Sequence, residues 1–530
     1  MAQKFRVLLS DSLAAAGIDV LKSHPEFEID IKTGLKPPEL AGIIGRYDAL
    51  VIRSGTKVTH EIIERADSLK VIGRAGVGVD NVDLEAATRR GIVVMNSPTG
   101  NSVTTAEHTI SMMMALARHI PAANAALKNG KWERNKFTGA EVCNKTLGVI
   151  GLGNIGRIVA DRALGLKMKV IGFDPLITAE AASRIGVELV SLDQLFEHSD
   201  FITVHTPLTD DTRGLVGRAA FERMKKGVRV INCARGGIVD EDALVEALNS
   251  GKVAGAALDV FVQEPPPADH PLLKFENVIV TPHLGAATDE AQVQVAVEIA
   301  HQVSDFLLEG TIRNAVNIPA LSPKEIETLE PYMKLAEKLG RLAAQLISET
   351  PNQVTVGFAG DAASLKTGVI ASAVLKGLLG SFLDEPLNSV NAPFLARERG
   401  INVTETISRE KIDYVNMLTV TVRSQVGEHE VAGAVLGRAP RIVRIDGYRV
   451  EAVPEGYFLM LHNRDVPGVV GAVGTILGQS GINIGGLELG RDRIGGMALS
   501  LVEVDEAVPT AVLERLKTIP AITTASLIKL

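Results

Sequence analysis

Residues 146–160, with the sequence TLGVIGLGNIGRIVA, decide the fold of the central part of this chain. The apolar run ends at Gly151, and Gly153 and Gly156 follow at the spacing G-x-G-x-x-G. Between a strand and a helix, the first glycine permits a tight turn and the second lets the backbone approach a pyrophosphate, while the third allows close helix–strand packing. The phosphates then lie at the helix N-terminus. We therefore predict a dinucleotide site here.

A second apolar run, Lys169 to Asp174, supports this interpretation. Its last residue is acidic and lies at about the 20-residue offset expected after such a glycine motif. Asp174 can bind the ribose hydroxyls and repel a 2'-phosphate, which favours NAD over NADP. The alternative is a glycine-rich turn in an unrelated α/β domain, and the joint occurrence of strand, spacing and acid favours the dinucleotide site over it.

Length and composition limit the remaining possibilities. At 530 residues the chain is too long for one hydrophobic core and suggests three or four domains. Its 46% hydrophobic and 22% charged residues are typical of a soluble globular protein. A net charge of -8, without a long Lys/Arg run, argues against nucleic acid or an anionic membrane as the main partner.

The two cysteines and the N-terminus bear on the compartment. Cys143 and Cys233 form neither a disulfide framework nor a spacing typical of a metal or redox site, so we predict no metal. The first residues, MAQKFRVLLS, lead directly into a strand without a signal-type apolar core. No apolar run reaches the roughly 18 residues of a membrane span. We expect a cytoplasmic protein.

Alternating strand-like and amphipathic stretches predict two α/β units with parallel sheets. A long helical stretch, 102–129, leads from the first unit to the second, and a helical run from Ala287 to Leu308 crosses back. The nucleotide domain (99–285) is thus expected as an insertion into a first domain (1–98 and 286–318), with a substrate cleft between them. The expected strands are 5–9, 49–52, 69–72 and 92–95 in the first unit and 146–150, 169–174, 200–205, 228–232, 253–259 and 277–281 in the second.

Beyond residue 318 the pattern changes to α+β. Residues 319–453 contain one or two helices over 324–349, a helix over 363–379 and strand-like runs at 353–358 and 416–422. From 454 to 530 the order becomes β-α-β-β-α-β, which is ferredoxin-like. We therefore expect two further domains after the two parallel-sheet domains.

The ends of the strands in the second unit carry the candidate chemistry. In an open parallel sheet, ligands bind at the carboxyl ends of the strands. Arg235, Glu264 and His283 each follow a different expected strand, so they should meet at the edge where the nicotinamide lies. The segments at this edge are His205-Thr206-Pro207, Asn232-Cys233-Ala234-Arg235-Gly236-Gly237, Asp259 to Pro265 and Pro282 to Ala286.

Hydride transfer from a hydroxy acid needs a base for the hydroxyl proton and a cation for the carboxylate. His283 suits the base, Glu264 can fix its ring by accepting the other N–H, and Arg235 can grip a carboxylate in a bidentate way. Taken singly, Arg235 could be a structural ion-pair partner, Glu264 a solvated loop acid and His283 a helix cap. Cys233 could be a nucleophile, although a small buried side chain is favoured.

At these motifs the chain resembles the D-isomer-specific 2-hydroxyacid dehydrogenases. The matching stretches are 151–156 (GLGNIG), 232–237 (NCARGG), 258–265 (LDVFVQEP) and 281–286 (TPHLGA). The resemblance implies Arg235, Glu264 and His283 as catalytic residues and NAD as cofactor. The implied cofactor contacts are Gly151, Gly153, Asn154, Ile155, Gly156, Asp174, Thr206, Pro207, Cys233, Ala234, Arg235, Asp259, His283, Gly285 and Ala286.

Within this family, residues 51–58 and 73–81 resemble the substrate loops of members that oxidise 3-phosphoglycerate to 3-phosphohydroxypyruvate, the first step of phosphorylated serine synthesis. This implies substrate contacts by Arg53, Ser54, Arg74 and Gly76. Without the resemblance, both arginines could be surface cations. Two alternatives stay open, namely another D-2-hydroxy acid such as glycerate, and a regulatory protein that uses the fold to sense NAD.

The C-terminal residues resemble regulatory parts of long members of the family. Residues 456–530 resemble an ACT domain, a module that commonly binds an amino acid at a domain interface, and 319–453 resemble the domain that precedes it there. The resemblance implies L-serine as a feedback effector, with contacts by Asn463, Asp465 and Asn483. It also implies a homo-oligomer, expected to be a tetramer.

Overall fold

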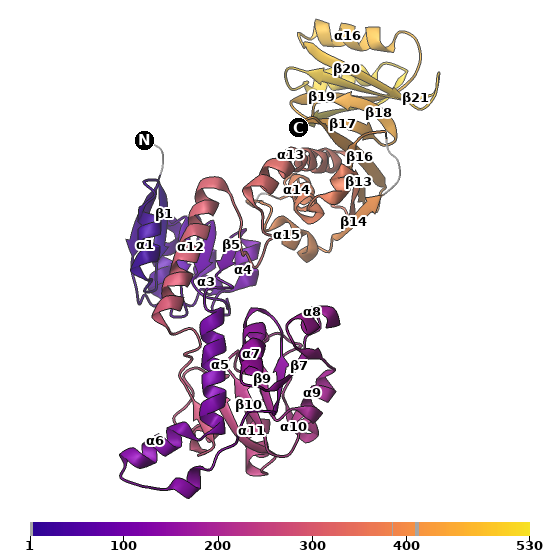
Figure 1. The fold of residues 1–530 in the computed structure, drawn as a ribbon. Helices are drawn as coiled ribbons and strands as arrows, with labels where there is room; N and C mark the ends of the chain where they lie inside the picture. The colour runs from indigo at the N-terminus through magenta and orange to yellow at the C-terminus, as the bar shows by residue number, and fades with distance from the viewer. Residues whose placement is uncertain (1–3, 384, 409–412) are drawn as a thin grey trace.

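The computed structural model describes residues 4–383, 385–408 and 413–530. Their strands form four sheets, and each sheet is built from strands that are consecutive along the chain (Figure 1). The predicted fold class is confirmed. Two doubly wound parallel-sheet domains are followed by an α+β domain and a ferredoxin-like domain.

The first sheet has five parallel strands in the order β2-β1-β3-β4-β5. Helix α12 (Asp289–Glu309), which lies far along the chain, packs against α1 and β4 of this unit (Figure 1). The nucleotide domain is therefore inserted into the first domain, as expected. The elements are β1 (Phe5–Leu9), α1 (Ala15–Lys22), β2 (Phe27–Ile31), α2 (Pro37–Ile43), the 3₁₀ helix η1 (Ile44–Arg46), β3 (Ala49–Ile52), α3 (His60–Glu64), β4 (Val71–Arg74), α4 (Leu84–Arg89) and β5 (Val93–Asn96).

The second sheet has seven parallel strands in the order β12-β11-β10-β9-β6-β7-β8. Counted from β6, the first six follow the order 3-2-1-4-5-6 of a dinucleotide-binding sheet, and the order in which strands are added reverses between β6 and β9. The elements are β6 (Thr146–Ile150), α7 (Asn154–Gly165), β7 (Lys169–Phe173), α8 (Ala179–Arg184), β8 (Glu188–Leu189), α9 (Leu192–His198), β9 (Phe201–Val204), α10 (Arg218–Arg223), β10 (Val228–Asn232), α11 (Glu241–Asn249), β11 (Val253–Leu258), η3 (Pro271–Lys274) and β12 (Val278–Val280).

The helical stretch expected over 102–129 is divided into two helices, which corrects the sequence-based expectation. Helix α5 (Ser102–Ala117) runs from the first unit into the second, and α6 (Ile120–Lys128) projects away from the second sheet, followed by η2 (Arg134–Phe137) (Figure 1). His119 between them has φ 53°, a left-handed conformation that ends a helix. Pro121 then occupies the first turn of α6, where its missing N–H costs nothing.

The third sheet is mixed and the fourth is antiparallel. In the order β14-β13-β15-β16-β17-β18, only β13 and β14 pair in parallel. The order β20-β21-β19-β22 is that of a ferredoxin-like sheet. The elements are α13 (Pro323–Leu346), β13 (Gln353–Gly360), η4 (Asp361–Ser364), α14 (Thr367–Leu379), α15 (Ala392–Glu398), β14 (Asn402–Ser408), β15 (Asn416–Arg423), β16 (Glu428–Leu436), β17 (Ala439–Ile445), β18 (Tyr448–Ala452), β19 (Tyr457–Arg464), α16 (Val469–Gln479), β20 (Ile484–Arg491), β21 (Met497–Val504), α17 (Thr510–Lys517) and β22 (Ile522–Lys529).

Local sequence signals set the ends of the two longest helices. The Thr288 side chain accepts the Ala291 N–H at the start of α12, and Gly310 with φ 72° closes that helix. Ser322 and Glu325 form a capping box at the start of α13. The N-terminal caps satisfy N–H groups that the helix leaves unpaired, and the Gly310 N–H donates to the Phe306 carbonyl oxygen at the other end of α12.

Candidate functional site

The glycine loop after β6 has the geometry of an anion cradle. Gly151 has φ 91°, and a Cβ there would lie 2.6 Å from the His205 carbonyl oxygen. A Cβ at Gly156 would overlap the Gly151 carbonyl oxygen, which explains the third glycine. Gly153 precedes α7 without a side-chain cap, and space for a Cβ there is open. The first N–H groups of α7 are thus left for a phosphate group.

Asp174 lies beside this loop, immediately after β7. Its Oδ2 accepts the Leu152 N–H at 2.8 Å, and its Oδ1 accepts the Leu176 N–H at 2.8 Å. The carboxylate is therefore held at the glycine turn, where a dinucleotide presents a ribose. Leu176 is 94% exposed, an unusual position for a large apolar side chain at the rim of such a site.

Two polar atoms after β9 are buried without a partner among the described residues, namely His205 Nδ1 and Thr206 Oγ1. Burial lowers the pKa of His205 to about 3, so its ring is neutral at physiological pH. Buried polar groups normally form hydrogen bonds, and a bound ligand can supply them. Together with the glycine cradle, these atoms fit a dinucleotide such as NAD.

The Arg235 side chain reaches across to the first unit. Its Nε donates to Asp80 Oδ2 at 2.8 Å, and its Nη1 donates to the Ala234 carbonyl oxygen at 2.7 Å. The loop itself is tied to Asn232, whose Nδ2 donates to the Arg235 carbonyl oxygen at 2.8 Å. Burial raises the pKa of the Cys233 thiol to about 12, which disfavours the nucleophilic thiolate. The buried Cys233 thiol is thus disfavoured as a nucleophile, whereas the Arg235 guanidinium is paired with an acid of the first unit.

Glu264 and His283 lie in direct contact. His283 Nδ1 is 2.8 Å from Glu264 Oε2, and Glu264 Oε1 accepts the Phe261 N–H at 3.1 Å. Burial alone would raise the pKa of Glu264, but these two hydrogen bonds outweigh it and lower the pKa. His283 has φ 54°, a costly conformation for a non-glycine residue that the surrounding structure must impose. The contact leaves Nε2 of His283 for a ligand.

Asp259 holds the segment that carries His283. Its carboxylate is buried and accepts hydrogen bonds from Thr281 Oγ1 at 2.5 Å, Leu284 N at 2.7 Å and Gly285 N at 2.8 Å. His108 Nε2 on α5 lies 3.2 Å from Asp259 Oδ1. Burial raises the pKa of Asp259, but these donors outweigh it, so the net shift is downward.

All four predicted substrate residues belong to the first unit, and Arg74 among them lies close to Arg235. Arg74 is mostly buried, and its Nε has no hydrogen-bond partner among the described residues. Burial, followed by the nearby charge of Arg235, lowers the pKa of Arg74 to about 10. A Cβ at Gly76 would overlap Arg74 Nη1. Arg53 is held by its backbone N–H to Asp11 Oδ2 at 2.6 Å, and Ser54 is exposed.

The three predicted effector residues have separate hydrogen-bond partners. Asn463 is buried, and its Oδ1 accepts the Ser500 hydroxyl at 2.8 Å. The pKa of Asp465 is lowered by hydrogen bonds from the Gly495 N–H and from Arg491. Asn483 Nδ2 donates to Asp505 Oδ2 at 2.8 Å.

Sequence reasoning missed Asp80 and His108. Asp80 contacts Arg235 across 155 positions of the chain, and His108 contacts Asp259 from a helix in which nothing sets it apart. Among residues 4–383, 385–408 and 413–530, no group of three or more His, Cys, Asp or Glu side chains is placed to hold a metal ion. No helix in the same ranges is long and apolar enough to cross a membrane.

Three family models match successive parts of the chain. Residues 110–285 match the NAD binding domain of D-isomer specific 2-hydroxyacid dehydrogenase. Residues 328–446 match the D-3-phosphoglycerate dehydrogenase intervening domain, and residues 457–521 match the ACT domain.

Several relatives are similar over nearly the full length. The D-3-phosphoglycerate dehydrogenase of Synechocystis is 47% identical, over 99% of this chain and 95% of its own length. Those of Archaeoglobus fulgidus and Bacillus subtilis are 45% and 41% identical, over 99% of this chain and all of theirs.

Solved structures resemble the catalytic half. A D-lactate dehydrogenase from Aquifex aeolicus, complexed with NAD and lactic acid, is 29% identical, with a TM-score of 0.53. The match covers 59% of this chain and all of that one. The chain is an NAD-dependent dehydrogenase, and it belongs to the D-3-phosphoglycerate dehydrogenase family.

Proposed function

We propose that this protein oxidises 3-phospho-D-glycerate to 3-phosphohydroxypyruvate with NAD, as the first step of phosphorylated L-serine biosynthesis. Two observations carry the proposal: the direct contact of Glu264 with His283, and the proximity of Arg235 to Arg74 of the first unit. They support a base at the dinucleotide edge and a pair of cations for the carboxylate and the phosphate of the substrate.

The chain's own residues supply proton transfer and charge stabilisation. His283 Nε2 accepts the C2 hydroxyl proton as the C2 hydride leaves, and Glu264 holds the ring and stabilises the imidazolium. Arg235 binds the substrate carboxylate and, in the reverse direction, polarises the C2 carbonyl. NAD, when bound, accepts the hydride. These are the catalytic roles that we assign to Arg235, Glu264 and His283.

For the cofactor we propose a site that extends from the glycine cradle to the segment after β12. The cradle holds the pyrophosphate, Asp174 the ribose, and the ends of β9, β10 and β11 the nicotinamide half. The proposed contacts are Gly151, Gly153, Asn154, Ile155, Gly156, Asp174, Thr206, Pro207, Cys233, Ala234, Arg235, Asp259, His283, Gly285 and Ala286.

For the substrate we propose contacts by Arg53, Ser54, Arg74 and the Gly76 backbone. The substrate has a carboxylate and a phosphate, and the guanidinium groups of Arg53 and Arg235 lie close enough to Arg74 for their charges to lower its pKa. The corresponding domains are assigned as 1–98 with 286–318 for substrate and 99–285 for NAD, followed by 319–453 and 454–530 for regulation.

Purified protein supplied with NAD tests the proposal directly. NADH should form from 3-phospho-D-glycerate when hydrazine traps the product, and it should form much more slowly with NADP, because Asp174 repels a 2'-phosphate. Faster turnover of D-glycerate would assign the protein to another D-2-hydroxy acid. A folded protein that binds NAD but turns over neither substrate would favour an NAD-sensing regulatory protein.

We propose L-serine as an effector bound at the ACT domain, with Asn463, Asp465 and Asn483 as its contacts. Support comes from the match of residues 457–521 to the ACT domain. Millimolar serine should lower turnover and raise the melting temperature. Neither effect in wild-type protein would leave residues 454–530 without a serine site.

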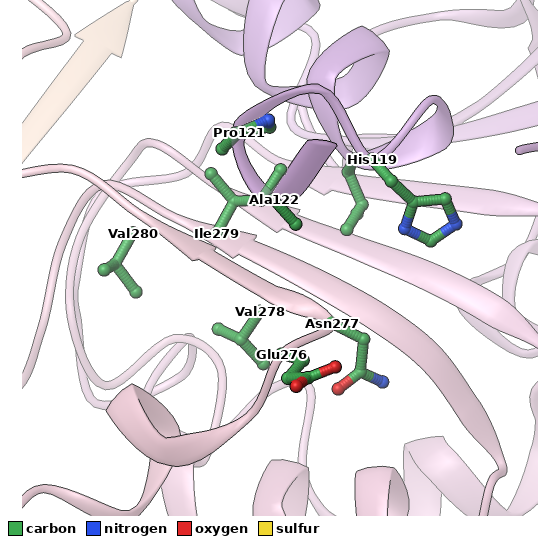
Figure 2. Close-up of a pocket in the computed structure, with 9 residues that line it drawn as sticks. His119, Pro121, Ala122, Glu276, Asn277, Val278, Ile279 and Val280 are labelled. Atoms are coloured by element: carbon green, nitrogen blue, oxygen red, sulfur yellow. The ribbon is translucent and has the colours of Figure 1, made fainter. Parts of the chain in front are cut away.

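We further propose a cytoplasmic homo-oligomer, a tetramer. The segment formed by α6 and η2 projects from the second sheet (Figure 1). Its exposed apolar side chains support self-association, since Ile120, Leu127 and Trp132 are 54%, 57% and 81% exposed. A cavity of about 340 Å³ lies between the first turn of α6 and β12 (Figure 2). Light scattering measures the mass, and a monomer at micromolar concentration would contradict the proposal.

A further inference from the structure

We infer that Asp80 is a positioning residue, which holds the Arg235 guanidinium in the orientation that the substrate requires. The inference rests on the proposed role of Arg235 in binding the substrate carboxylate. Asp80 belongs to the loop after β4 in the first unit, whereas Arg235 follows β10 in the second. The contact therefore fixes a side chain of one domain from the other.

Two hydrogen bonds and one close backbone contact surround the Arg235 guanidinium. Its Nε donates to Asp80 Oδ2 at 2.8 Å, and its Nη1 donates to the Ala234 carbonyl oxygen at 2.7 Å. Its Nη2 lies directly against Gly78, where a Cβ would overlap it. A guanidinium has five N–H donors, so the remaining donors on Nη1 and Nη2 form the edge available to a carboxylate. Asp80 determines which edge that is.

The backbone around Asp80 is itself fixed by two asparagines. Asn96 Nδ2, at the end of β5, donates to the Val77 carbonyl oxygen at 2.5 Å. Asn81 Nδ2 donates to the carbonyl oxygens of Arg53 and Thr56 at 2.7 and 2.6 Å. Asp80 therefore belongs to a loop whose backbone is held by hydrogen bonds. A residue that orients another side chain needs such a rigid support.

Charge explains why an acid is needed at this place. Arg235 lies close enough to the mostly buried Arg74 for its charge to lower the pKa of Arg74, while the charge of Asp80 raises it. Asp80 therefore offsets repulsion between two guanidinium groups that the substrate needs side by side. The Asp80 side chain is 60% exposed, and such an ion pair adds little to stability. Its effect should therefore appear in catalysis rather than in folding.

A double-mutant cycle tests whether Asp80 acts through Arg235. The variants are Asp80→Ala, Arg235→Ala and the two combined, with Asp83→Ala as a matched control, since Asp83 lies nearby but only caps α4. Single-turnover oxidation of NADH by 3-phosphohydroxypyruvate, with enzyme in excess, keeps slow variants measurable. Tm and NADH affinity are recorded for each variant.

Asp80→Ala should lower kcat by about 10- to 100-fold with unchanged Tm and NADH affinity. When Arg235 is already alanine, Asp80→Ala should lower kcat further by less than about twofold, because Asp80 then has no guanidinium to orient. Asp80→Asn should recover only part of the rate, since its amide oxygen still accepts the Nε hydrogen bond but carries no charge to offset the repulsion between Arg235 and Arg74. Asp83→Ala should lower Tm without coupling to Arg235.

Two results would overturn the inference. One is that Asp80→Ala lowers kcat by the same factor in the Arg235→Ala protein as in the wild type. The other is a normal kcat in Asp80→Ala alone. A wild-type protein that does not turn over 3-phosphohydroxypyruvate would instead refute the proposed function, so the two failures are distinguishable.

Discussion

Replacing Gly78 with alanine is expected to move Arg235 without disturbing the fold. An alanine Cβ would lie 2.8 Å from Arg235 Cζ and would overlap Nη2, whereas ordinary contacts begin at 3.4 Å. Gly78 is not among the residues with positive φ, so its backbone accepts alanine. The same Cβ would lie 2.7 Å from Asp80 Oδ2. Both groups are ends of flexible side chains, so the ion pair of Arg235 with Asp80 should shift by roughly 0.6 Å or more.

The magnitude follows from the role proposed for Arg235. A displacement of about 1 Å at a reacting group can cost about 10²-fold, and removal of a donor that stabilises developing charge costs about 10²- to 10³-fold. We therefore expect kcat/KM of Gly78→Ala to fall by about 10²-fold, or about 2.7 kcal/mol. Stability should be unchanged or slightly greater, because alanine restricts the unfolded chain.

The assay is reduction of 3-phosphohydroxypyruvate by NADH, with Tm and NADH affinity measured on the same samples. Gly42→Ala in α2 is the matched control, because no atom lies within 4 Å of a Cβ there. It should gain about 0.5–1 kcal/mol of stability and retain full activity. The reasoning is refuted if Gly78→Ala folds normally and keeps kcat/KM within about threefold of wild type.

Three further predictions concern the second sheet. His283→Ala should lower kcat by about 10²-fold or more, and Glu264→Gln by about tenfold with little change in KM, as measured by steady-state kinetics. Asp174→Ser should raise kcat/KM with NADP relative to NAD, and an unchanged ratio would remove Asp174 from the ribose site. Burial lowers the pKa of His205 from 6.5 to about 3, so the unfolded chain binds a proton that the folded chain resists. Stability should therefore fall as the pH drops below about 6.5, at up to about 1.4 kcal/mol per pH unit, and urea unfolding of His205→Gln should show a weaker dependence.

Most of the parallel-sheet architecture could be predicted from the sequence because buried parallel strands are continuous apolar runs. Strands β1, β3, β6 and β10 have the predicted bounds. Strand β2, with the sequence FEIDI, was not predicted. It lies at the edge of its sheet, where solvent accepts the alternating acidic residues that obscured it.

Some contacts of the candidate site could be predicted from the sequence, and others could not. The ends of parallel strands must share one edge, so the contact between Glu264 and His283 could be anticipated from sequence order alone. The contact between Asp80 and Arg235 could not, because it depends on how two domains face each other. The helix break at His119 had a sequence signal that the prediction overlooked, since Pro121 follows it and a proline inside a helical pattern usually ends or kinks the helix.

The preference for a phosphorylated substrate tests the central claim most directly. The measurement is kcat/KM with NADH for 3-phosphohydroxypyruvate against unphosphorylated hydroxypyruvate. Each charge-assisted hydrogen bond from Arg53 or Arg74 to a phosphate is worth about 1.5–3 kcal/mol, so the phosphorylated substrate should be favoured by about 10²-fold or more. An equal or greater kcat/KM for hydroxypyruvate would contradict the account.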